Sequence, residues 1–136
     1  MARELGVAVV AYSPLGRGML SQTFKSPADL PEGDWRRTSP RFAAEAAANF
    51  EKAAALAALA ERKGCSPAQL ALAWLLSRGT DIFPIPGTKS ASRAVENAGA
   101  AAVSLSPEEV LEVEAAVPDV TGDRYEGRHG QFEDRE

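Results

Sequence analysis

Hydroxyl and cationic side chains are concentrated in residues 87–93, Gly-Thr-Lys-Ser-Ala-Ser-Arg, which lie between an apolar run and an expected helix. Backbone amides at a helix N-terminus are unpaired and the helix dipole adds partial positive charge, so such a position favours an anion. Thr88 and Ser90 would add hydroxyl donors. The positive charge of Arg93 is unfavourable in the first turn of its own helix, because the helix dipole is also positive there. A phosphate bound beside Arg93 would offset this repulsion. The alternative is that a serine is an ordinary N-cap and the cations are solvated surface charges.

A second candidate loop is residues 13–18, Ser-Pro-Leu-Gly-Arg-Gly, which follow another apolar run. Gly16 and Gly18 would let the backbone approach a ligand closely. The spacing is neither GxGxxG nor a P-loop, and on spacing alone such a segment is more often a plain turn. Neither loop therefore establishes a nucleotide site by itself.

Two short strands are expected to end at these loops. Residues 7–12 form an apolar run between Gly6 and a Ser-Pro turn signal, which predicts a strand buried on both faces, as in parallel sheets. Residues 81–85 predict a second strand, in which Pro84 removes one ladder donor. The segment 13–40 is rich in glycine and proline and is predicted to be a long loop of the functional or mobile kind.

Four helices are predicted around the strands. The first covers about residues 41–63 and ends at Gly64. The second follows a Ser-Pro-Ala-Gln capping box at 66–69 and ends near residue 79, and its apolarity on all sides predicts deep burial. The third covers about residues 90–98. The fourth begins after a second capping box at 106–109 and is ended by proline.

The order strand, loop, helix, helix, strand, helix, helix predicts an α/β fold, with right-handed crossovers to a parallel sheet. Two strands alone would leave both sheet edges and most of their apolar surface open. We therefore expect residues 1–136 to be a single piece of a larger barrel or sheet, with residues 1–118 ordered and 119–136 a mobile tail. A homo-oligomer or a missing N-terminal segment would cover the exposed strand faces.

Composition narrows the partners and the compartment. The net charge of -4 argues against nucleic acid as a partner, because phosphate neutralisation needs an excess of Lys and Arg. The single cysteine, Cys65, cannot close an intrachain disulfide, which fits a reducing cytoplasm. The longest mostly apolar stretch, 68–76, is far below the ~20 residues of a membrane span. We expect a cytoplasmic chain without nucleic-acid or membrane partners.

Three segments together resemble the aldo-keto reductase superfamily, particularly its bacterial members. The segments are Ala-Tyr-Ser-Pro-Leu-Gly-Arg-Gly at 11–18, the helix start at 66–74, and Ile-Pro-Gly-Thr-Lys-Ser at 85–90. The resemblance covers about residues 1–125 and implies a partial TIM (β/α)8 barrel, consisting of its last two strands with their helices and the C-terminal helix. It also implies NADP(H) as cofactor and a small-molecule carbonyl compound as substrate.

Site residues follow from the resemblance position by position. The first loop would lie against the cofactor pyrophosphate, and an aromatic residue at the strand end would stack on the nicotinamide ring, although a core Tyr fits that position equally well. The second loop would hold the 2'-phosphate, where cations and hydroxyls separate NADP from NAD. Two residues further along would contact the adenosine. The residues against the pyrophosphate would be Ser13, Leu15, Gly16 and Arg17, and the stacking aromatic residue would be Tyr12. The residues around the 2'-phosphate would be Gly87, Thr88, Lys89, Ser90 and Arg93. The adenosine contacts would be Glu96 and Asn97.

The family's catalytic Asp, Tyr, Lys and His have no counterpart in this sequence, because the family carries them on preceding strands. His129 and Tyr125 lie after the last predicted helix and are expected to be surface residues. The resemblance therefore implies the cofactor-binding part of an NADPH-dependent oxidoreductase that reduces aldehydes or ketones to alcohols, inactive by itself. The alternative is a non-catalytic nucleotide-binding or oligomerising module derived from such an enzyme.

Overall fold

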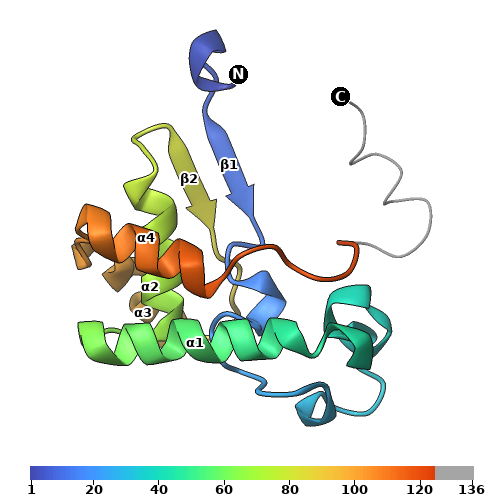
Figure 1. Cartoon of the computed structure of the whole chain (residues 1–136). Coiled ribbons are helices and arrows are strands. Elements are labelled where there is room, and N and C mark those ends of the chain that lie inside the picture. Colours follow the sequence, from blue (N-terminus) through green and yellow to red (C-terminus); the bar gives the residue numbers. More distant parts are fainter. Residues whose placement is uncertain (125–136) are drawn as a thin grey trace.

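The computed structural model describes residues 1–124, which form a two-stranded parallel sheet and four α-helices (Figure 1). The strands are β1 (Val9–Tyr12) and β2 (Ile82–Ile85), and Val9 lies opposite Ile82 in their register. The helices are α1 (Ala48–Lys63), α2 (Pro67–Ser77), α3 (Ala91–Ala98) and α4 (Pro107–Ala116). The predicted α/β class, the parallel pairing and the order of elements are confirmed.

The two faces of the sheet differ in burial. Side chains alternate between the faces of a strand, and Ala11, Ile82 and Pro84 are half-buried on the face that packs against α2. The opposite face carries Val10 and Phe83, whose exposed fractions are 58% and 52%. The prediction of burial on both faces was wrong for the described chain, because α2 packs against only one face of the sheet. The open face agrees with the expectation that two strands alone leave most of their apolar surface exposed.

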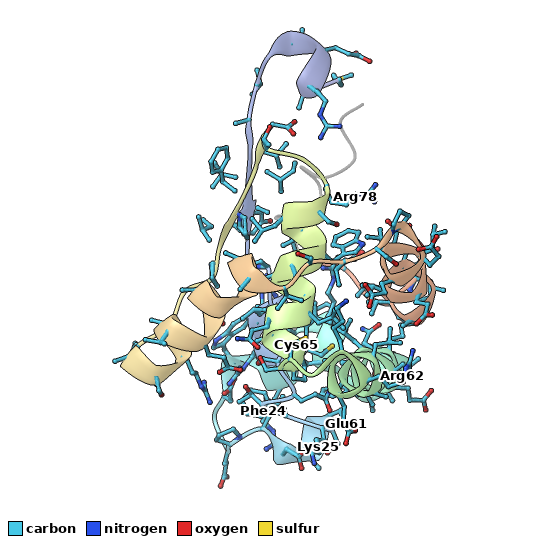
Figure 2. All side chains as sticks on the ribbon, turned by 90° about the vertical axis from the view of Figure 1, so that its left-hand side faces the viewer. Phe24, Lys25, Glu61, Arg62, Cys65 and Arg78 are labelled. Carbon is cyan, nitrogen blue, oxygen red and sulfur yellow. The ribbon has the colours of Figure 1, made fainter. Side chains whose placement is uncertain are left out.

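A core forms where α1, α2 and α4 meet. Its buried residues come from all three helices, and Leu56 of α1 has only 1% of its surface exposed. The others are Ala60, Leu70, Ala71 and Val113. The predicted deep burial of α2 is confirmed for its first part, which includes the buried Ala68 and residues 70–73, whereas Leu76 near its end is 39% exposed. Figure 2 shows Cys65 and Arg78 at opposite ends of this helix.

Local sequence signals set most of the helix ends. Ser66 Oγ accepts from the Gln69 amide at 3.2 Å, while Gln69 Oε1 accepts from the Ser66 amide at 3.0 Å, so the predicted capping box before α2 is confirmed. The box before α4 is also present. Gly64 ends α1 in a left-handed conformation with φ 73°, as its position predicted.

Other boundaries differ from the predictions. α1 begins at Ala48 and not near residue 41, because the preceding residues form short 3-10 turns that bury Phe42 and Ala46. β1 begins at Val9 rather than residue 7, and α2 ends at Ser77. The long loop 13–40 contains three more 3-10 turns: Gly16–Gly18, Pro27–Asp29 and Trp35–Thr38.

Beyond α4 the chain turns back across the carboxyl end of β1 (Figure 1). The predicted tail starts at residue 119, and its first six residues make hydrogen bonds to α1, to the turn before it and to the loop after β1. The remaining predicted tail, 125–136, including Tyr125 and His129, lies outside the described residues.

Candidate functional site

A cleft of about 780 Å³ opens at the carboxyl ends of the two strands. Its walls come from the loop after β1, the loop after β2 and the first turns of α3. The lining residues are Ser13, Pro14, Leu15, Arg17, Gly18, Ser21, Gln22, Thr23, Phe24, Arg36, Ala68, Ile85, Pro86, Gly87, Thr88, Arg93, Glu96 and Asn97. The two loops singled out in the sequence, about 70 residues apart, therefore face one space.

The loop after β1 is a run of left-handed backbone. Gly16, Arg17 and Gly18 have φ values of 57°, 58° and 101°. A Cβ on Gly18 would lie 3.2 Å from the Phe24 ring and 3.3 Å from the Arg36 guanidinium, so only glycine fits without displacement. Close packing against Phe24 and Arg36 therefore explains why a glycine occupies position 18, and the turn places its backbone in the wall of the cleft.

Arg36, which also lines the cleft, lies beside this turn and fixes it. Its Nη1 donates to the carbonyl of Arg17 at 2.8 Å, and its guanidinium lies 4.2 Å from the centre of the Phe24 ring. Nη2 and Nε donate to the carboxylate of Asp34 at 2.6 and 2.9 Å. Both partners of this ion pair are largely buried, with 19% and 14% of their side chains exposed. The pair therefore anchors the segment around residue 35 to the cleft.

The ion pair gives a pH prediction. Hydrogen bonds from the Arg36 side chain, and then from its backbone amide, lower the pKa of Asp34 from 3.8 to about 2. A lowered folded-state pKa stabilises the protein above the unfolded value, and this contribution is lost as the pH falls from about 4 to 2. A ¹³C NMR titration of the Asp34 carboxyl should give a midpoint near 2. In Arg36→Gln the midpoint should return toward 3.8, and an unchanged midpoint there would show that Arg36 is not the cause.

The start of α3 uses its hydroxyls locally. Ser90 is the N-cap, and its Oγ accepts from the Arg93 amide at 3.4 Å and hydrogen-bonds Ser92 Oγ at 2.8 Å. Thr88 Oγ1 accepts from the Ser90 amide at 3.1 Å. The N-cap interpretation of Ser90 therefore holds in this structure. Thr88, Lys89 and Arg93 are all exposed, but only Thr88 and Arg93 line the cleft.

α3 is tied to the rest of the site through the capping box of α2. Gln69 completes that box with its Oε1 and donates from Nε2 to the carbonyl of Glu96 at 3.0 Å. Glu96 and Asn97 are half-buried and line the cleft. One glutamine side chain thus sets both the start of α2 and the position of α3.

The aromatic residue at the end of β1 faces a second, adjoining hollow of about 380 Å³. Tyr12 and Gly16 line this hollow, which shares Ser13 and Arg17 with the larger cleft. The guanidinium carbon of Arg124 lies 4.8 Å from the centre of the Tyr12 ring. The two spaces therefore adjoin at the loop after β1.

Most of the predicted site residues are brought together. Those in the cleft itself are Ser13, Leu15, Arg17, Gly87, Thr88, Arg93, Glu96 and Asn97. Tyr12 and Gly16 line the adjoining hollow, while Lys89 and Ser90 line neither space. Sequence reasoning missed the lining residues Ser21, Gln22, Thr23, Phe24, Arg36 and Ala68. The Asp-x-Arg spacing at 34–36 was the available signal, but its target on the backbone of Arg17 leaves no trace in the sequence.

Within residues 1–124 no helix is long and apolar enough to cross a membrane. Across the same part of the chain, His, Cys, Asp and Glu side chains nowhere gather in a group of three that could hold a metal ion.

The fold and the site define a parallel α/β protein with a polar, partly cationic cleft at the carboxyl ends of its strands. Residues 1–118 match the model of the aldo/keto reductase family, so the chain belongs to this family of oxidoreductases, as the three sequence segments predicted. Aldo-keto reductase str7 of Strobilurus tenacellus is 46% identical over 129 residues, covering 90% of this chain and 38% of that relative. Aldo-keto reductase yakc [NADP(+)] of Schizosaccharomyces pombe is 45% identical over 126 residues, covering 90% of this chain and 37% of that relative.

Among solved structures, the glycerol dehydrogenase AKR11B4 from Gluconobacter oxydans is similar, with a TM-score of 0.69 and 27% sequence identity. The match covers 91% of this chain and 39% of that structure. The chain thus spans less than two fifths of the length of these relatives.

Proposed function

We propose that the cleft binds NADPH and that the chain is the C-terminal, cofactor-binding part of an NADPH-dependent reductase of aldehydes or ketones. The observation that carries the proposal is that one space joins the loop after β1 to the start of α3. These are the two places where backbone amides, hydroxyls and arginines suit phosphate groups. The printed name of the Schizosaccharomyces pombe relative, which includes NADP(+), supports the choice of cofactor.

The residues fit this cofactor in size and charge. A volume of about 780 Å³ lies within the range of small-molecule sites. Arg93 can pair with a 2'-phosphate at the start of α3, with Thr88 beside it, and the glycine turn after β1 can receive the pyrophosphate. Glu96 and Asn97 would then hold the adenosine. Bound NADPH would supply the hydride, and the ring of Tyr12 would keep the nicotinamide at the end of β1.

The sheet supports the second half of the proposal, a partial (β/α)8 barrel. Each strand of the described sheet has a free edge, and the face bearing Val10, Tyr12, Phe83 and Ile85 is exposed. Further strands would pair with those edges, close the open face and bring the family's catalytic acid. We expect the chain by itself to bind cofactor without reducing carbonyl compounds, and we place it in the cytoplasm.

The open face also favours a second candidate, a non-catalytic nucleotide-binding module that docks through that surface. Both candidates share the cofactor cleft. They differ in whether adding the preceding family strands to the chain restores aldehyde reduction. Restored turnover would support the reductase, and cofactor binding that stays without turnover would support the module.

The cofactor claim is tested by titrating the chain with NADPH and with NADH while following tryptophan fluorescence. Trp35 is a suitable reporter, because its ring lies 5.1 Å from the Arg17 guanidinium at the cleft. We expect a micromolar dissociation constant for NADPH and weaker binding of NADH. Competition by 2'-AMP but not by 5'-AMP would assign the preference to the 2'-phosphate. Binding of neither dinucleotide would reject the proposal.

A further inference from the structure

Residues 119–124, here called the strap, are held against α1 by hydrogen bonds. Asn49 Nδ2 donates to the carbonyl of Thr121 at 2.8 Å, and the Thr121 amide donates to Asn49 Oδ1 at 2.9 Å. Lys52 Nζ donates to the carbonyl of Asp119. Asn49 is only 3% exposed and uses both ends of its amide on the strap, so it fixes the strap at one point.

A glycine completes this attachment. Arg41 Nε donates to the carbonyl of Gly122 at 3.1 Å. Gly122 has φ 88°, and a Cβ there would lie 2.7 Å from the carbonyl oxygen of Pro40. An alanine at this position would combine an unfavourable backbone conformation with a clash against backbone atoms. Substituting it should therefore lift the strap without touching the core.

The far end of the strap reaches the candidate cofactor site. Arg17 Nη1 donates to the carbonyl of Arg124 at 3.0 Å, and the Arg124 guanidinium lies over the Tyr12 ring. Figure 1 shows this segment crossing the end of β1. The strap thus places a permanent positive charge on the aromatic ring to which the proposed function assigns the nicotinamide.

We propose that Arg124 is a specificity residue that makes the site favour reduced over oxidised dinucleotide. The inference rests on the proposed function. The nicotinamide ring of NADP⁺ carries a positive charge, whereas the dihydronicotinamide ring of NADPH is neutral. A guanidinium at the Tyr12 ring repels the charged ring and competes with it for the same cation–π interaction. The neutral ring of NADPH meets no such repulsion. NADP⁺, which carbonyl reduction leaves in the site, therefore dissociates more readily than NADPH.

The test compares dissociation constants for NADPH and NADP⁺ in the full chain and in Arg124→Gln. We expect NADP⁺ to bind about fivefold more tightly in the variant and NADPH to change by less than about twofold, as expected for loss of one cationic contact at an exposed ring. Arg62→Gln is the matched control. This variant also removes one positive charge, but at the C-terminal end of α1, where Arg62 pairs with Glu112 (Figure 2). Asn49, which holds the strap, lies at the other end of the helix, so both dissociation constants should stay the same.

Two further variants separate charge from attachment. Arg124→Lys keeps the charge, so its ratio of the two constants should stay near that of the unmodified chain. Gly122→Ala keeps Arg124 but releases the strap, and it should reproduce the shift of Arg124→Gln, with faster hydrogen exchange at the Thr121 amide. Binding of both dinucleotides with an unchanged ratio in Arg124→Gln would overturn the inference alone. Binding of neither dinucleotide by the unmodified chain and by Arg124→Gln would overturn the proposed function as well.

Discussion

Replacing Arg93 with glutamate should weaken NADPH binding by about 100-fold and change NADH binding by less than about threefold. Arg93 lines the cleft in the first turn of α3, where its charge opposes the helix dipole unless an anion is present. A charge-assisted hydrogen bond to the 2'-phosphate would be lost, and the new carboxylate would repel that group. Because NADH lacks the 2'-phosphate, its affinity reports only the remaining contacts. Fluorescence titration of both cofactors measures the difference.

Lys89→Glu provides the matched control for this experiment. It makes the same change of charge four residues earlier; both side chains are exposed, but Arg93 lines the cleft and Lys89 does not. We expect its effect on NADPH to be below about fivefold, as for a charge screened by solvent. Equal losses in the two variants would mean that the general field of the loop attracts the cofactor, and that Arg93 does not bind the phosphate directly.

Signals that act within a few residues allowed much of the fold to be predicted. The serine, proline and glutamine at 66–69 define the start of α2 in the sequence, and the structure contains the corresponding pair of hydrogen bonds. Gly64 ends α1 for an equally local reason, its left-handed conformation. The parallel pairing followed from the helices between the strands, because parallel strands need such a crossover.

Features that depend on distant contacts could not be predicted in the same way. The start of α1 was placed too early because alanine is a good helix former, but the burial of Phe42 keeps the preceding residues in tighter turns. The hydrogen bond from Arg36 to the Arg17 carbonyl joins residues 19 positions apart, and that from Asn49 to Thr121 spans 72. Neither has a sequence pattern, so one wall of the cleft and the whole strap were found only in the structure.

The stability of the site should depend on the helical core behind it. Leu56→Ala is expected to lower the free energy of unfolding by about 3 kcal/mol, the usual cost of truncating a fully buried leucine. Leu56 is 1% exposed and contacts α2 and α4 through the cluster around Leu70 and Val113. α1 also carries Asn49, so loosening its packing should release the strap. Urea unfolding followed by circular dichroism measures the change.

Leu111→Ala is the control for this prediction, since it makes the same truncation within α4 at a side chain that is 64% exposed. Its free energy of unfolding should change by less than about 0.5 kcal/mol. A small loss for Leu56→Ala, comparable to that of the control, would mean that α1 is not packed against α2 and α4 in solution. The cleft would then lose its support, because α2 supplies Ala68 to its wall and Gln69 to the anchoring of α3.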